Sequence, residues 1–270
     1  MSYINKIFRL LKKTKNESFK FIKLAYIGEK YQCPVCFTKL SYFDIVPDWW
    51  LQKLKRYGHI YSINDYETFN LEKNTCPVCK TGDSNRLYAI YLRKRFTKLD
   101  TKKKYLFIDF APVPPLAKLI KSYPSINYRS VDLYMADVDD RIDITDMRIY
   151  KNNSVDMFLC SHVLEHVSND IKAMSELKRI LKPSGWGILM VPIMLSIKKN
   201  QEDSTIKNEG EKWKYYGQGD HVRMYSKEGF LQRMTKVGFK VEQLGIDYFG
   251  AKVFDKYGIS PKSILYIVSK

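Results

Sequence analysis

Four of the five cysteines in this chain form two Cys-Pro-Val-Cys motifs, and their spacing points to metal chemistry. Two intervening residues allow both thiolates of a motif to reach one ion at about 2.3 Å, and a second motif completes a tetrahedral zinc site. Because four protein ligands fill the coordination shell, the predicted ion is structural. The predicted ligands are Cys33, Cys36, Cys76 and Cys79.

Other interpretations of these cysteines are a redox pair or reduced core residues. His59 lies between the motifs and is a candidate replacement ligand, although an ordinary surface histidine is the preferred interpretation. The 39 residues between the motifs exceed the usual gap of a zinc ribbon, which predicts an insertion with structure of its own.

A second group of candidates consists of acids at the predicted ends of strands. Asp109 ends one apolar run, and Asp132 ends the next run at the spacing where a carboxylate binds both hydroxyls of a ribose. Asp143 then offers an acceptor to an adenine amino group, beside an apolar ring contact from Ile144. The chain has no G-x-G-x-x-G motif, which argues against a dinucleotide because a pyrophosphate needs such a loop.

These acids need a parallel sheet to bring them together. Apolar runs predict strands at 105–109, 128–132, 154–160, 186–191, 240–246 and 264–268, and amphipathic runs predict helices at 84–98, 116–122, 171–181 and 227–237. Residues 182–185 read as a turn that ends the third of these helices, and Ser84 as the N-cap of the first. This alternation predicts an α/β fold with a Rossmann-like, doubly wound sheet.

Residues 154–192 resemble class I S-adenosylmethionine (SAM)-dependent methyltransferases of the type 11 group. The matching text is SVDMFLCSHVLEHV at 154–167, ELKRILKPSG at 176–185 and MVP at 190–192. A branch of this group also has paired CPxC motifs, an FAP loop in place of a glycine-rich loop, and a GQ-DHVR-Y element, which match residues 33–79, 110–112 and 217–225. The first loop lacks the three glycines of many relatives, and Ser184 replaces the first glycine of a KPGG turn.

The resemblance implies the seven-stranded class I fold, SAM as the cofactor and methyl transfer as the reaction. On this basis the predicted cofactor-binding residues are Asp109, Phe110, Ala111, Pro112, Asp132, Leu133, Asp143, Ile144, Cys160, Ser161 and His162. The predicted domains are a basic amphipathic helix at 1–27, a zinc-binding module with a linker helix at 28–98, and a SAM-dependent methyltransferase domain at 99–270.

A hydroxyl acceptor needs a base, and histidine is the natural candidate because it titrates near neutral pH. His221 lies after the fifth strand, on the substrate side of such folds, and is the predicted base; His162 is the second choice. Arg223 is predicted to hold a substrate anion. A structural role for this segment is the alternative. The polar insert at 195–216 is predicted to act as a lid or acceptor-binding element.

The text from His162 to His166 also spells H-x-x-E-H, the inverted zinc-protease motif. That chemistry requires a helix, whereas this motif begins where a buried strand is predicted to end. His162 is therefore predicted to line the cofactor site, and Glu165 and His166 to shape the following turn.

The net charge of +17 favours an anionic partner, although a lysine-rich composition also arises without one. The leading hypothesis is O-methylation of a sugar, nucleotide-sugar or lipid-linked glycan. An RNA methyltransferase with a zinc-knuckle recognition module and a non-catalytic zinc-containing interaction protein are the alternatives. Without an apolar run long enough to span a bilayer, we expect a cytoplasmic protein. Residues 1–15 suggest contact with an anionic membrane, but packing on the protein itself is preferred.

Overall fold

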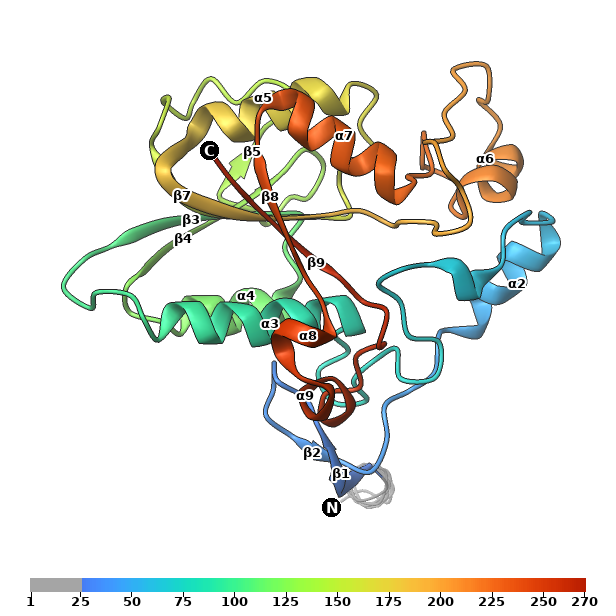
Figure 1. The fold of residues 1–270 in the computed structure, drawn as a ribbon, viewed down its shortest axis with the longest axis horizontal. Coiled ribbons are helices and arrows are strands. Elements are labelled where there is room, and N and C mark those ends of the chain that lie inside the picture. The colour runs from blue at the N-terminus through green and yellow to red at the C-terminus, as the bar shows by residue number, and fades with distance from the viewer. Residues whose placement is uncertain (1–25) are drawn as a thin grey trace, which may run out of the picture.

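The computed structural model describes residues 26–270, and its centre is a seven-stranded sheet with the order β5-β4-β3-β6-β7-β9-β8 (Figure 1). The strands from β3 to β7 pair in parallel, whereas β9 is antiparallel to both of its neighbours. The strands are β3 (Tyr105–Phe110), β4 (Ile126–Asp132), β5 (Asp140–Arg141), β6 (Val155–Ser161), β7 (Leu181–Met190), β8 (Lys240–Leu244) and β9 (Leu265–Ser269). The predicted doubly wound α/β fold is confirmed.

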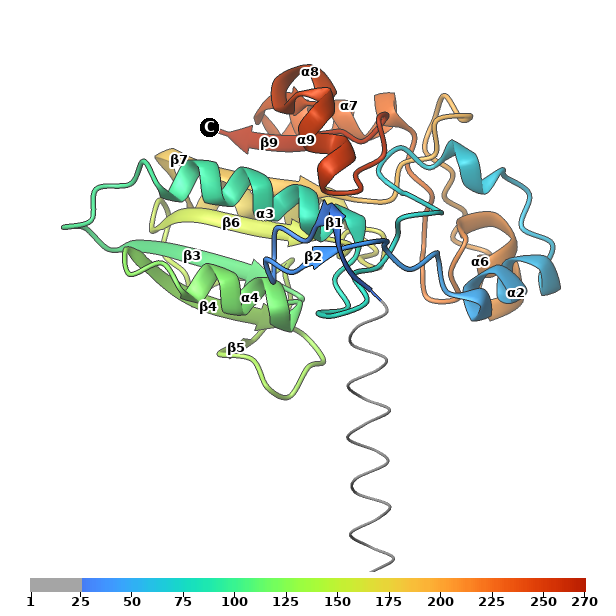
Figure 2. The same ribbon diagram turned by 90° about the horizontal axis from the view of Figure 1, so that it is seen from below.

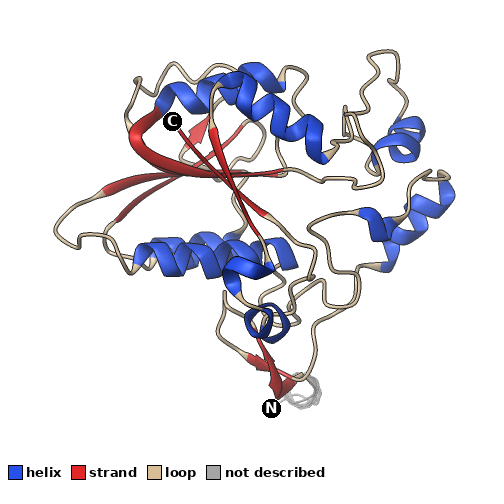
Figure 3. Cartoon of the chain, viewed as in Figure 1, coloured by secondary structure: helices blue, strands red, loops and turns tan. Residues whose placement is uncertain are grey.

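Helices cover both faces of this sheet. The helices α3 (Asp83–Phe96) and α4 (Pro114–Lys121) lie on one face, and α5 (Asp170–Ile180) and α7 (Lys227–Val237) lie on the other (Figures 1 and 3). Apolar side chains from both layers meet the strands in one hydrophobic core. This arrangement leaves the carboxyl ends of the parallel strands open to a ligand, as in other open α/β sheets.

Several predicted boundaries differ from the structure. Ser84 lies inside the first turn of α3 because Gly82 is the N-cap residue. The predicted turn at 182–185 is instead part of β7, which follows α5 directly and pairs with β6 across an irregularity near Asp156. The strand β8 ends at Leu244, and a short helix, α8 (Ile246–Phe249), begins two residues later.

The cysteine motifs lie below the sheet in Figure 1, and the strand before the first motif contacts α9 (Ala251–Lys256). The first motif follows the strand β1 (Ile27–Gln32), which pairs with β2 (Lys39–Leu40). The insertion between the motifs has the structure expected of it: α2 (Asp48–Arg56) and a 3-10 turn, η1 (Ile63–Asp65). It packs against α6 (Glu209–Tyr216) of the polar insert, beyond the ends of the parallel strands (Figure 2).

The amphipathic helix predicted at 1–27, with its membrane-contacting residues 1–15, lies almost entirely outside the described residues. Within residues 26–270, no helix combines the length and the apolar character needed to cross a membrane.

Candidate active site

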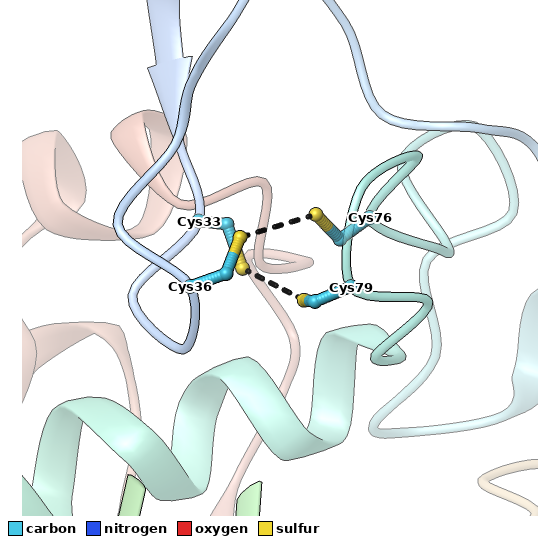
Figure 4. A group of neighbouring side chains, drawn as sticks. All are labelled: Cys33, Cys36, Cys76 and Cys79. Atoms are coloured by element: carbon cyan, nitrogen blue, oxygen red, sulfur yellow. Dashed lines mark hydrogen bonds between the residues drawn. The ribbon is translucent and has the colours of Figure 1, made fainter. Parts of the chain in front are cut away.

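The two cysteine motifs face each other across a small gap and bring four sulfur atoms together (Figure 4). The Sγ atoms of Cys33 and Cys79 are 3.6 Å apart, and those of Cys36 and Cys76 are 3.8 Å apart. A tetrahedral ion with bonds of about 2.3 Å would hold its sulfur ligands about 3.8 Å apart. None of the four forms a disulfide. These two separations are close to the value that tetrahedral zinc requires.

His59 is not part of this cluster. Its Nδ1 atom lies 3.1 and 3.0 Å from the carbonyl oxygens of Trp213 and Lys214, in α6. Its ring also stacks on Tyr66. The preferred interpretation of a surface histidine is thus corrected, because His59 joins the insertion to the polar insert.

Arg86 of α3 fixes the cysteine motifs to the main sheet. Its buried guanidinium donates hydrogen bonds to backbone carbonyls on both sides of the second motif and at the end of α9. The acceptors are Lys73, Asn74, Thr81, Tyr257 and Gly258. Because a buried guanidinium is stable only when its donors are satisfied, this network fixes the relative positions of three segments.

A cavity of about 650 Å³ lies at the carboxyl ends of β3, β4 and β6, where a cofactor was predicted. We call it the strand-end cavity. Its lining residues are Phe110, Ala111, Val131, Asp132, Leu133, Tyr134, Ile142, Asp143, Ile144, Thr145, His162, Val163, His166, Val167, Ser168, Asn169 and Asp220. Its volume is in the range of small-molecule and cofactor sites.

Asp132 is the best-placed acid in the strand-end cavity. Its Oδ1 atom accepts hydrogen bonds from the backbone amides of Tyr134 and Met135, at 2.6 and 2.7 Å. Its Oδ2 atom has no protein partner among the described residues. Asp143 similarly uses Oδ1 to accept a hydrogen bond from the amide of Thr145. In both residues, loop amides orient the carboxylate and leave one oxygen for a ligand.

The loop after β3 adopts a conformation that a glycine usually provides. Ala111 has a φ of 52°, in the left-handed region, and its amide donates to the carbonyl of Val131. Alanine has the smallest side chain that still bears a Cβ atom, so the backbone can approach a ligand closely. The chain thus makes this tight turn without a glycine.

Four residues predicted to bind the cofactor do not line the strand-end cavity. Asp109 is buried within the fold, and the hydroxyl of Tyr128 donates a hydrogen bond to its Oδ2 atom. Burial raises the pKa of Asp109 to about 7. Cys160 is buried, and the Ser161 hydroxyl is hydrogen-bonded to that of Tyr88. Pro112 lies outside the lining set. The structure therefore does not place these four residues against the strand-end cavity. For Asp109 the reason is that alternate strand residues point to opposite faces of the sheet, and Phe110 is the one that lines the cavity.

A second cavity, of about 360 Å³, adjoins the first, and we call it the aromatic cavity. Its lining residues are Trp50, Tyr66, Thr68, Phe69, His162, Glu165, His166, Val191, Pro192, Ile193, Gly217, Gln218 and His221. The first four come from the insertion between the cysteine motifs. His162 and His166 line both cavities, so these two histidines mark the place where the cavities meet.

The rings of Trp50, Tyr66 and Phe69 form one wall of the aromatic cavity, with centroids 5.4 to 6.2 Å apart. The wall is fixed by backbone pairing between the insertion and the segment after β7. The amide of Glu67 donates to the carbonyl of Ile193 at 2.9 Å, on either side of a bridge between Tyr66 and Met194. Sequence analysis missed this wall entirely, because the insertion has no repeating apolar pattern.

Polar groups concentrate on the other side of the aromatic cavity. The Nδ1 atom of His162 lies 3.2 Å from Oε1 of the buried Glu165. Burial lowers the pKa of His221. Burial also opposes protonation of His162, but its hydrogen bond with the Glu165 carboxylate outweighs this effect and raises the pKa of His162. The predicted base, His221, and the predicted site residue His162 both line the aromatic cavity. Of these two residues, only His162 also lines the strand-end cavity.

Arg223 is buried and hydrogen-bonded within the protein. Only 4% of its side chain is exposed, and its guanidinium donates to Glu202 and to the carbonyls of Leu164, Val167 and Ser168. The predicted role of holding a substrate anion is corrected. Arg223 instead stabilises the turn that carries Glu165 and His166.

The order of the strands, the antiparallel β9 and the strand-end cavity define a class I methyltransferase fold. The family model of a methyltransferase domain matches residues 85–244, which is more than half of the chain. The chain therefore belongs to the methyltransferase domain family.

An uncharacterized protein of Methanocaldococcus jannaschii is 33% identical over 116 residues. The match covers 43% of this chain and 43% of that protein, so the chain spans less than half of the relative. Among solved structures, a SAM-dependent methyltransferase from Archaeoglobus fulgidus is 14% identical, with a TM-score of 0.43, over 69% of this chain and 94% of that one. A putative methyltransferase from Bacillus halodurans is also 14% identical, with a TM-score of 0.41, over 66% of this chain and 94% of that one.

Proposed function

We propose that this chain transfers the methyl group of SAM to a hydroxyl of a sugar, nucleotide-sugar or lipid-linked glycan. The observation that carries this proposal is the pair of adjoining cavities, which share His162 and His166. One cavity has the acids expected around an adenosyl group, and the other offers a flat aromatic wall beside polar side chains. Family membership supports the methyl transfer, and the aromatic cavity supports the class of acceptor.

The strand-end cavity suits the adenosyl part of SAM. The free oxygen of Asp132 would accept hydrogen bonds from the ribose hydroxyls, and Asp143 would accept one from the adenine amino group. Ile144 is buried and lines the same cavity, where it would contact the adenine ring. The methionine part needs only the close backbone approach that Ala111 allows.

The aromatic cavity suits a ring with one apolar face and polar edges. Trp50, Tyr66 and Phe69 provide a large apolar surface, and Gln218 adds hydrogen-bonding groups beside them. A pyranose ring has this character, because its C–H bonds form a face and its hydroxyls lie around the edge. A volume of about 360 Å³ is at the lower end of the range for small-molecule sites, so one sugar ring is a suitable occupant.

His162 is better placed than His221 to remove the proton of the acceptor hydroxyl. It lies where the cavities meet, its Nδ1 atom is held by Glu165, and its Nε2 atom has no protein partner among residues 26–270. In the reaction, the acceptor oxygen forms a bond to the methyl carbon while the sulfur–carbon bond breaks. The electron pair of that bond goes to sulfur, and the hydroxyl proton goes to Nε2 of His162. The protein's main contribution is to hold the reacting atoms in line.

The cysteine cluster is proposed to hold one structural zinc ion. The four thiolates fit tetrahedral coordination and would complete it without an open position. The ion would hold together the two ends of the insertion that forms the aromatic wall.

The test combines purified chain and methyl-labelled SAM with separate pools of nucleotide-sugars, lipid-linked glycans and RNA. We expect label in a sugar or glycan pool, and we expect His162→Gln to lose turnover even at saturating SAM. Label found only in RNA, with binding that weakens steeply as salt rises, would replace this proposal with RNA methylation. Failure to bind SAM in calorimetry would indicate a non-catalytic protein.

A further inference from the structure

We propose that Glu165, His166 and His221 bind a divalent transition-metal ion in the aromatic cavity. One ligand atom from each residue lies within 4.8 Å of the other two. All three residues line the aromatic cavity, so an ion there would face an occupant of the cavity. The site is separate from the cysteine cluster and uses a different set of ligand atoms.

Glu165 supplies a buried carboxylate oxygen that lacks a partner. The residue is 1% exposed, and its Oε1 atom is engaged with His162 at 3.2 Å. Its Oε2 atom is buried without a hydrogen-bond partner. Because leaving such an oxygen unsatisfied is costly, it marks a place where a cation would stabilise the protein.

Both histidines have a partner at Nδ1 of the kind that metal-ligating histidines usually have. Nδ1 of His166 lies 3.2 Å from a carboxylate oxygen of Asp220, and Nδ1 of His221 lies 3.1 Å from the carbonyl oxygen of Tyr216. When Nδ1 carries the proton, Nε2 has the free lone pair, and neither Nε2 atom has a protein partner in the described part of the chain. Ligating histidines characteristically donate their other N–H to a carboxylate or carbonyl in this way.

The ligand set comes from two segments that the fold holds together. The ring centroids of His166 and His221 are 4.7 Å apart, at an interplanar angle of 84°. The amide of Val222 donates to the carbonyl of Glu165 at 2.8 Å, which places the second segment directly beside the first. The H-x-x-E-H motif does not form the helical site that inverted zinc proteases need. It lies in a turn with His162 at a φ of 57°, and the third ligand is His221 rather than His162.

Two imidazoles and one carboxylate select for a transition ion such as zinc, because magnesium and calcium prefer oxygen ligands alone. Three protein ligands also leave a coordination position open. We infer that the acceptor hydroxyl takes this position, where the ion would act as a Lewis acid on its oxygen. This last role rests on the proposed function, whereas binding of the ion does not.

The test counts metal ions per chain. Protein is equilibrated with Zn²⁺, desalted and analysed by elemental mass spectrometry. We expect two equivalents for the native chain, and one each for Glu165→Gln and His221→Ala. His59→Ala is the matched control and should retain two, because His59 belongs to neither site. Titration with Co²⁺ should show that the equivalent lost in the variants lacks the sulfur-to-metal absorption of the cysteine cluster.

A native chain that binds one equivalent, or variants that retain two, would overturn the inference. If Glu165→Gln does not fold, the exposed Asp220→Asn tests the same ion through His166. Its expected effect is 10- to 100-fold weaker affinity, and unchanged affinity would count against the site. Two equivalents of metal without methyl transfer to any glycan would refute only the proposed function. Methyl transfer by a chain with one equivalent would refute only the ion in the aromatic cavity.

Discussion

Replacement of Asp132 by asparagine tests whether this carboxylate binds the methyl donor. Oδ1 of Asp132 orients the loop through the amides of Tyr134 and Met135, and its Oδ2 atom is left for a ligand. Asparagine retains one acceptor oxygen for those amides but replaces the other with an NH₂ group that only donates. The change therefore removes the proposed acceptor for the ribose hydroxyls without releasing the loop.

The expected loss follows from the strength of hydrogen bonds to charged groups. Such a bond contributes about 1.5–3 kcal/mol, and each 1.4 kcal/mol is tenfold in affinity. We therefore expect Asp132→Asn to weaken SAM binding about 10- to 150-fold. Asp132→Ala should weaken it further, because two loop amides then lose their acceptor as well.

Isothermal titration calorimetry with SAM and with S-adenosylhomocysteine measures these affinities directly. Asp137→Asn is the matched control, because Asp137 is an exposed carboxylate of the same loop that does not line the strand-end cavity. Equal affinities for the native chain and Asp132→Asn would refute the ribose assignment. A loss confined to Asp132→Ala would show that Asp132 orders the loop and does not contact the donor.

Three further predictions concern other parts of the molecule. Cys76→Ser should release the cluster metal and lower the melting temperature sharply, because structural zinc contributes on the order of 10 kcal/mol; zinc analysis and thermal unfolding report both effects. Trp50→Ala should raise the KM for the acceptor about 2- to 10-fold and leave the Kd of SAM unchanged, because Trp50 lines only the aromatic cavity. Burial raises the pKa of Asp109 from 3.8 to about 7, so its neutral form stabilises the folded state below pH 3.8, and this contribution is lost as the pH rises through 7. The native chain should therefore lose roughly 3 kcal/mol of unfolding free energy relative to Asp109→Asn between pH 4 and pH 7, as urea titrations at each pH would show; parallel curves would contradict the assigned pKa.

Much of the sheet and one of the two cavities follow from local sequence patterns. Buried parallel strands are short apolar runs, and the acids that follow them must gather at one edge, as Asp132 and Asp143 do. This reasoning fails for Asp109, which does not line the cavity. It is the penultimate residue of its strand and points away from the face that Phe110 exposes to the cavity. Because helices cover both faces of a parallel sheet, apolar residues occur on both faces. The sequence pattern therefore does not show which strand residues point to which face.

The aromatic cavity was not predictable, because its parts come from distant segments. Tyr66 pairs with Met194 through a backbone bridge that no local pattern encodes, and Trp50 packs against this cluster through its side chain. The role of Arg223 was hidden for the same reason. Apart from Glu202, its hydrogen-bond partners are backbone carbonyls of residues 164–168, and every residue type has a backbone carbonyl. The cysteine cluster was predictable because the two-residue spacing within each motif limits the geometry that its thiolates can form.

The position of the insertion has a consequence for how such a protein can diversify. Both ends of the 39-residue segment are fixed by the cysteine motifs, and only its middle reaches the aromatic cavity. Closing a loop at a rigid base costs little more when the loop is lengthened, because the entropy grows only with the logarithm of its length. If the aromatic cavity holds the acceptor, as proposed, changes in the sequence and length of this segment would alter the acceptor site and leave the strand-end cavity unchanged.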